Sequence, residues 1–136
     1  MPTKAEIIEF LKTEFPQNTC VVEEVGAGRS VVRQEIGYGA LRPGGTVSGP
    51  VLMTIADVAL YVALLGEIGI VPLAVTTNLS INFLRKPTAG KAIIGVCELI
   101  KVGRSLAVGE VNIYSDGDDK PVAHAVGTYS IPKPTV

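Results

Sequence analysis

The chain has 136 residues, 47% of them hydrophobic, and its 12 basic residues nearly balance 13 acidic ones. This size and composition predict one domain, residues 1–136, that forms a hydrophobic core without needing disulfide or metal cross-links. The net charge of −1 argues against nucleic acid or an anionic membrane surface as a partner, because either would need a basic face. Cys20 and Cys97 are interpreted as core hydrophobes rather than a metal pair, so no metal is expected.

Residues 1–15 carry charges throughout and are not expected to form a signal peptide. No uncharged apolar run reaches the ~18 residues of a membrane helix, so a cytoplasmic location is the expectation. Thr3 is placed to cap a short helix that runs to about Glu14, and Glu6 completes a capping box. The apolar stripe of this helix suits docking on a sheet, and Pro16 ends it.

Two strands are predicted next, joined by a turn at Ala27-Gly28. Glycines and a proline make residues 37–45 a loop. Pro50 suits the first turn of a second, longer helix, because its missing N–H costs nothing there. This helix should end at about Gly66 or Gly69.

The remainder is predicted to be sheet. Residues 73–84 alternate apolar and polar side chains, which indicates a half-buried strand with Thr77 on the apolar face and Thr76 on the polar one. Gly103-Arg104 and the segment 115–120 are predicted hairpin turns between the last three strands. Six strands and one long apolar helix indicate an α+β fold in which the sheet curls around the helix.

Residues 50–67 are apolar on nearly every side of the helical wheel, which is typical of a helix wrapped by other elements. Thr54, Asp57 and Tyr61 are spaced i, i+3, i+7 and form one narrow polar stripe. An isolated buried carboxylate is costly unless it is hydrogen-bonded, and proteins keep such groups mainly for chemistry. The stripe is interpreted as facing a second subunit, with a plain solvent strip as the alternative.

Several segments together resemble the PaaI-like hotdog thioesterases. They are the Gly-rich loop, the Ala56-Asp57 pair in the helix, and the stretches VTTNLSINFLRKPTAG, KVGRSLAVGEV and AVGTYSI. The resemblance implies a hotdog fold, a long central helix wrapped by an antiparallel sheet, and a dimer that joins two sheets edge to edge, often paired again into a tetramer. It also implies hydrolysis of a small or medium acyl-CoA, aromatic ones included, with sites at the dimer interface and no cofactor beyond the substrate's CoA.

The resemblance makes Asp57 the general base on a water or the nucleophile, and that choice stays open. Gly49 matches the glycine whose backbone N–H polarises the thioester carbonyl, a role that suits a helix N-terminus. The hydroxyl that orients the water falls on Thr76 or Thr77. In such dimers Gly49 comes from one subunit, and Asp57 with the threonine comes from the other.

The family's CoA contacts fall on the end of the predicted strand 73–84 and on the VGRS turn. The matching residues are Asn78, Phe83, Arg85, Lys86, Gly103, Arg104 and Ser105. Cationic side chains suit CoA phosphates, although ordinary solvated loop charge is an equal interpretation of each cation.

The loop before the helix departs from the family pattern. The usual His-Gly-Gly is Ser48-Gly49-Pro50 here, and Ser48 is a candidate helix N-cap. The family's upstream Asn is Arg42, which can pair with Asp57 across the interface or bind an acidic group of the ligand. A non-catalytic acyl-CoA or acyl-ligand binder is therefore the alternative function. The one histidine, His124, is expected to be a structural or surface residue.

Overall fold

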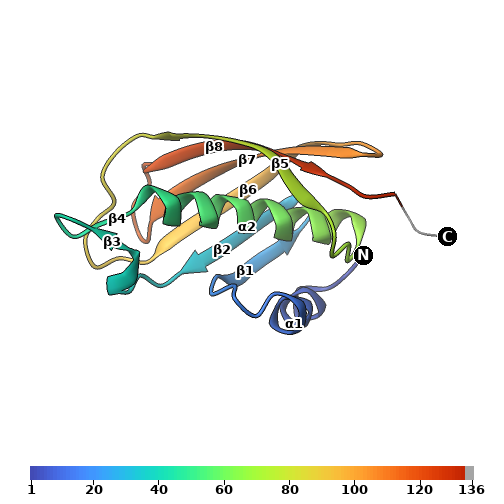
Figure 1. Cartoon of the computed structure of the whole chain (residues 1–136), viewed down its shortest axis with the longest axis horizontal. Helices are drawn as coiled ribbons and strands as arrows, with labels where there is room; N and C mark the ends of the chain where they lie inside the picture. The colour runs from blue at the N-terminus through green and yellow to red at the C-terminus, as the bar shows by residue number, and fades with distance from the viewer. Residues whose placement is uncertain (134–136) are drawn as a thin grey trace.

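A computed structural model describes residues 1–133 of the chain. A curved antiparallel sheet wraps one long helix, and a short N-terminal helix lies beside the first strand (Figure 1). The helices are α1 (Lys4–Glu14) and α2 (Gly49–Ile68). The strands of the main sheet are β1 (Val21–Gly26), β2 (Arg29–Gln34), β5 (Val75–Phe83), β6 (Ile93–Val102), β7 (Leu106–Ser115) and β8 (Ala123–Ser130).

Helix α1 begins and ends where the sequence predicts. The Thr3 hydroxyl accepts from the Glu6 N–H, and the Glu6 carboxylate accepts from the Thr3 N–H, so both halves of the capping box are present. Ile7 and Leu11 are buried and dock the helix against β1 and α2. The short helix is thereby fixed beside the C-terminal half of α2, where Ile7 approaches Gly66.

The six strands lie in the order β1-β2-β6-β7-β8-β5, and every neighbouring pair is antiparallel. The predicted turns at Ala27-Gly28, Gly103-Arg104 and 115–120 each lie between paired strands. Strands β1 and β5 form the two edges. These findings confirm the α+β prediction of a long helix wrapped by about six strands.

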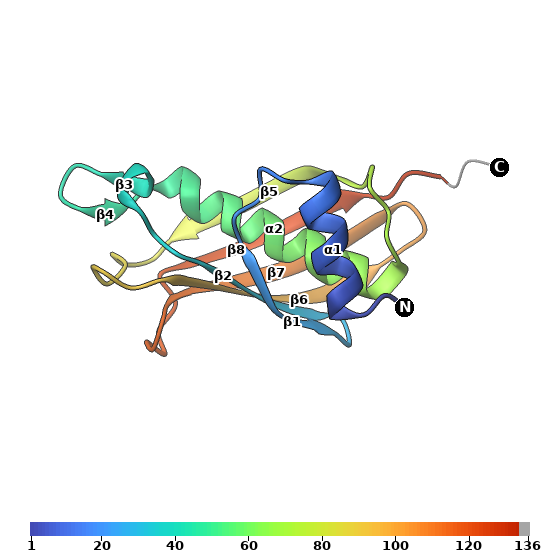
Figure 2. The same cartoon turned by 90° about the horizontal axis from the view of Figure 1, so that it is seen from below.

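Helix α2 lies along one face of the curved sheet (Figure 2). Two glycines in adjacent strands allow its close approach, because a Cβ at Gly127 would lie 2.4 Å from Leu60 and one at Gly109 would lie 2.7 Å from it. By length and composition α2 matches a membrane span, and the core helix of a wrapped sheet does so equally. The burial of eleven of its residues assigns α2 to the core.

The Gly-rich segment before α2 is more regular than the predicted loop. It holds a 3-10 turn, η1 (Tyr38–Ala40), and a small hairpin of β3 (Leu41–Arg42) and β4 (Thr46–Val47). Gly44 and Gly45 form its tip with φ of 94° and 75°, values that glycine adopts without a steric penalty. The Ser48 N–H donates to the Ala40 carbonyl at 2.9 Å, which fixes the route into α2.

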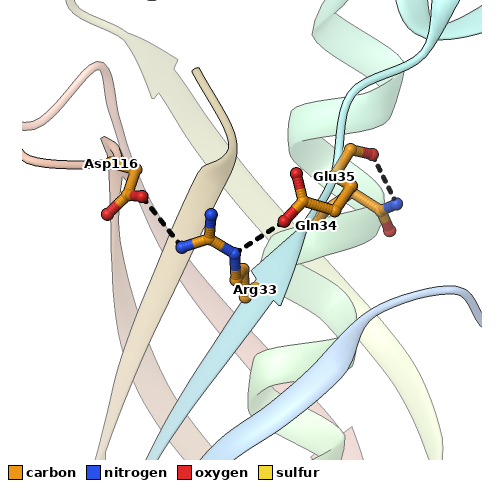
Figure 3. A network of polar contacts seen from close by, with 4 residues as sticks. All are labelled: Arg33, Gln34, Glu35 and Asp116. Atoms are coloured by element: carbon orange, nitrogen blue, oxygen red, sulfur yellow. Dashed lines mark hydrogen bonds and ion pairs between the residues drawn. The ribbon is translucent and has the colours of Figure 1, made fainter.

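A charged network holds the β7–β8 hairpin against β2 (Figure 3). Arg33 on β2 donates through Nε to Glu35 at 2.8 Å and through Nη1 to Asp116 at 2.9 Å. Asp116 lies in the turn that follows β7. The guanidinium therefore bridges two segments that β6 separates within the sheet.

Candidate active site

Asp57 lies in the middle of α2 and is held by two hydroxyl groups from the sheet. Thr76 Oγ1 donates to Asp57 Oδ1 at 2.5 Å, and the Tyr129 hydroxyl donates to the same oxygen at 2.8 Å. Thr76 on β5 and Tyr129 on β8 are paired in the strand register, so the pairing of β5 with β8 places both donors beside Asp57. One oxygen of the half-buried carboxylate is thereby occupied by hydrogen bonds from the protein.

Tyr129 is the donor in its bond to Asp57. Burial raises the pKa of the Tyr129 phenol well above its usual range, and the nearby charge of Asp57 raises it further. The Tyr129 ring stacks on Tyr61 with 5.8 Å between centroids. The Tyr61 hydroxyl donates in turn to the Pro72 carbonyl at 3.1 Å. These contacts fix the position of the Tyr129 hydroxyl, and the raised pKa of Tyr129 favours the protonated form that donates to Asp57.

A β-bulge decides which threonine reaches Asp57. The register of β5 against β8 shifts between Thr76 and Asn78, which leaves Thr77 as the extra residue. Thr77 is exposed and donates to the Thr128 carbonyl at 3.3 Å. The prediction that strict alternation places Thr77, and not Thr76, on the apolar face is therefore wrong. Of the two candidates, Thr76 is the one that contacts the carboxylate.

An open cavity of about 560 Å³ lies beside Asp57. Its walls include Phe10, Phe15, Tyr61, Pro72, Thr76 and Tyr129. Both side-chain hydrogen bonds to Asp57 reach Oδ1, and within residues 1–133 none reaches Oδ2. Because Asp57 lines the cavity, Oδ2 is the oxygen available to a water or a substrate.

Gly49 starts α2, and it is remote from Asp57 in the same chain. Eight residue steps of helix separate the two, or about 12 Å along the axis. The N–H groups of a first helical turn have no intrahelical partner, so the Gly49 amide can donate outward. Ser48 occupies the N-cap as predicted, but its side chain makes no capping hydrogen bond. A Cβ on Gly49 would lie 3.2 Å from the Phe83 ring, so a larger residue here would require the Phe83 side chain to shift.

The remaining candidates divide between the two ends of β5. Exposed Arg85 and Lys86 follow Phe83 at the Gly49 end, and Arg85 Nε donates to the Pro121 carbonyl at 2.9 Å. Arg42, in the hairpin leading to Ser48, is also exposed. The turn Gly103–Ser105 lies at the other end, where the Ile131 N–H donates to the Ser105 carbonyl at 2.8 Å.

Asn78 is exposed between these ends, opposite Thr128. The seven steps from Thr76 to Phe83 span about 23 Å of strand. One chain therefore brings together Asp57 and Thr76, but it brings neither Gly49 nor Arg85 to them.

The predicted polar stripe on α2 does not face one environment. Thr54 is exposed and donates to the Pro50 carbonyl at 3.1 Å, Asp57 is half-buried, and Tyr61 is 8% exposed. Tyr61 is covered by residues of its own chain, because Phe10 and Tyr129 pack against its ring. The interpretation of all three residues as one subunit-facing stripe is wrong.

Tyr129 is the candidate site residue that the sequence did not indicate. The inward positions of β8 before it are small residues, Ala123, Ala125 and Gly127, which make room for α2. Tyr129 continues this inward series as a large side chain with a polar tip, and that change of size and polarity was the available signal. By contrast, His124 Nε2 lies 3.2 Å from Glu110 Oε2 in a half-buried pair between β7 and β8.

Comparison with known proteins identifies the family. The family model of the thioesterase superfamily matches residues 44–122. A structure of a candidate thioesterase from Silicibacter sp. TM1040 is 41% identical, with a TM-score of 0.88 over 96% of this chain and 92% of that one. The chain belongs to the thioesterase superfamily. The matched segment holds Gly49, Asp57 and Thr76 and ends before Tyr129. No curated protein sequence matches the chain significantly.

Two further structures identify the PaaI-like hotdog fold of this thioesterase-superfamily chain. The Escherichia coli PaaI protein from the phenylacetic acid degradation operon superposes with a TM-score of 0.76 at 20% identity, covering 93% of this chain and 94% of that one. A hypothetical thioesterase from Streptococcus pneumoniae, with coenzyme A, superposes with a TM-score of 0.78 at 21% identity, covering 93% and 99%. These confirm the fold implied by the resemblance.

Proposed function

We propose that this protein is an acyl-CoA thioesterase for a small or medium acyl group, with Asp57 as the catalytic carboxylate. The observation that carries the proposal is the placement of Asp57, whose Oδ1 is fixed by Thr76 and Tyr129 while the side chain lines an open cavity. Superfamily membership supports thioester hydrolysis. The Streptococcus relative with coenzyme A supports a CoA thioester as the substrate.

The active site is completed by a second copy of the chain. Strand β5 runs antiparallel to α2, with Thr76 beside Asp57 and Phe83 beside Gly49. A two-fold axis beside the middle of β5 would pair this edge strand with its copy and bring the Phe83 end of one chain to the Thr76 end of the other. Gly49, Arg85 and Lys86 of one subunit would then meet the partner's Asp57 end.

The character of the β5 edge supports this pairing. An edge strand presents unpaired backbone N–H and C=O groups, which favour the addition of another strand. Val75, Phe83 and Leu84 are 56%, 53% and 51% exposed, an unusual amount of apolar surface for an edge that meets water. A second copy would cover these side chains.

In the proposed reaction, Asp57 Oδ2 takes a proton from a water as the water oxygen bonds to the thioester carbon. The Gly49 N–H of the partner subunit donates to the carbonyl oxygen, which becomes negative in the tetrahedral intermediate. The C–S bond then breaks, the acid is released, and CoA leaves with a proton as the thiol. In the alternative route, which uses the same geometry, Oδ2 attacks the carbonyl carbon and the C–S bond breaks to release CoA thiolate. Water then hydrolyses the resulting anhydride, which regenerates the Asp57 carboxylate, releases the acid and leaves one proton for the CoA thiol.

The test is the turnover of a panel of acyl-CoA thioesters, followed by free-thiol release. Asp57→Asn should lower kcat by about 10² or more, the usual contribution of a positioned base, while CoA binding persists. Asp119→Asn, at an exposed carboxylate in the β7–β8 turn, is the matched control and should retain full activity. Activity unchanged by Asp57→Asn would refute the role of Asp57. Binding of acyl-CoA without turnover by the native chain would identify the non-catalytic binder instead.

A further inference from the structure

Building on the proposed thioesterase activity, we propose that helix α1 forms the outer wall of the acyl pocket and selects the acyl group. Phe10 and Phe15 accept an uncharged acyl group, and Glu14 rejects one that ends in a carboxylate. All three residues line the cavity beside Asp57.

The cavity is suited to the acyl part of the substrate rather than to CoA phosphates. Among the described residues that line it, Glu14 and Asp57 are the charged ones, and both are acidic. Within one chain, the candidate phosphate-binding cations Arg85, Lys86 and Arg104 line other parts of the surface. In the proposed dimer, the partner's Arg85 and the partner's Lys86 would arrive with Gly49 at the Asp57 end of the cavity and not at the Glu14 end. An anionic group near Glu14 would therefore be repelled, whereas an apolar group would bury its surface in the cavity.

Helix geometry places one face of α1 against the cavity. Ile7 and Leu11 are buried and anchor the helix on the sheet and α2. Phe10 and Glu14 are four residues apart, so they share one helix face and lie one turn from each other. Ile8 lies on another face and lines a separate cavity with Lys12 and Cys20.

An aromatic row connects α1 with the catalytic carboxylate. Phe10 contacts Tyr61 with 6.4 Å between ring centroids, and Tyr61 stacks on Tyr129 at 5.8 Å. Tyr129 donates to Asp57. An acyl chain whose thioester carbon lies at Asp57 would therefore extend along aromatic side chains toward α1, with Glu14 near its far end.

Binding of CoA thioethers tests this inference without depending on turnover. S-hexyl-CoA and S-(5-carboxypentyl)-CoA differ at the far end of the chain by a carboxylate, and isothermal titration calorimetry gives a Kd for each. The native chain should bind the hexyl compound more tightly. Glu14→Gln should tighten binding of the carboxypentyl compound about two- to fivefold, as expected when one exposed like charge is removed, and leave binding of the hexyl compound unchanged.

Matched controls come from the same helix. Glu9→Gln removes an exposed charge that does not line the cavity and should change neither Kd. Phe10→Ala should weaken hexyl binding about tenfold through lost apolar contact, Phe10→Leu should weaken it less, and Ile8→Ala should not weaken it. Circular dichroism confirms folding of each variant.

Three results would overturn the inference: equal effects of Glu14→Gln and Glu9→Gln, equal effects of Phe10→Leu and Ile8→Ala, or no binding of either thioether by the native chain. Hydrolysis of hexanoyl-CoA and adipoyl-CoA, measured alongside, reports on the proposed catalysis separately. A chain that binds both thioethers with the predicted selectivity but hydrolyses neither thioester would refute the catalysis and leave the pocket assignment standing.

Discussion

The two ends of β5 hold the two parts of the proposed site by different means. At the Thr76 end, Asp57 is fixed by side-chain hydroxyls from two paired strands and by stacked aromatic rings. At the Phe83 end, the candidate groups are the backbone N–H of Gly49 and exposed cations on the loop after β5. The proposed catalytic carboxylate is thus positioned by the core, whereas the candidate binding groups lie at the start of α2 and on the loop after β5.

The loop end is nonetheless anchored. The Thr88 N–H donates to Ser115 Oγ at 2.9 Å, and Thr88 Oγ1 donates to Asp118 at 2.6 Å. Ser115 is fully buried, and the adjacent Asp116 is bound by Arg33 (Figure 3). The β7–β8 hairpin therefore holds the loop that carries Arg85 and Lys86. The difference predicts that substitutions around Asp57 will change mainly kcat, and that substitutions in the loop after β5 will change mainly KM.

The largest expected effect comes from mixing two variants, each altered at a different end of the site. Asp57→Asn is expected to disable one end of the site. Gly49→Val is expected to disable the other, because a Cβ at Gly49 would already lie 3.2 Å from the Phe83 ring and a branched side chain would displace that ring or the start of α2. If each site takes one end from each subunit, a mixed dimer holds one intact site. Equal mixing with random exchange should then restore about a quarter of the native activity, measured as free-thiol release. Activity that stays at the level of the separate variants would refute the shared site.

A smaller effect is expected at the Asp57 end. Tyr129→Phe removes a donor to Asp57 Oδ1 and keeps the ring stacked on Tyr61. A hydrogen bond to a charged group is typically worth 1.5–3 kcal/mol, so we expect kcat to fall about tenfold while KM changes little. Tyr114→Phe, on β7 and outside the cavity, is the control. A change confined to KM would mean that Tyr129 shapes the pocket without positioning the carboxylate.

The smallest effect is expected at the loop end. Thr88→Val removes the hydroxyl bond to Asp118 and keeps the backbone bond to Ser115. The loss of one exposed neutral-to-charged hydrogen bond should raise KM for acyl-CoA about threefold and leave kcat unchanged. Thr46→Val, in the small hairpin before α2, serves as the control in steady-state assays. A fall in kcat with unchanged KM would contradict the division between the two ends.

The local elements could be predicted from the sequence because short-range physics sets them. Thr3 with Glu6 defines the start of α1, and glycine turns define the hairpins. Asp57 stood out because a carboxylate is rare within an apolar helical run, and the family resemblance then supplied Gly49. These features depend on residues close together in the chain.

The tertiary structure alone decided how Asp57 is held. The choice of Thr76 over Thr77 depends on a bulge in the β5–β8 register, and Tyr129 reaches Asp57 from 72 residues away. Strand register is set by packing of the whole sheet on α2, so alternation within one segment does not specify it. For the same reason, only the packing of α2 against β5 decides that Gly49 and Asp57 lie at opposite ends of this strand.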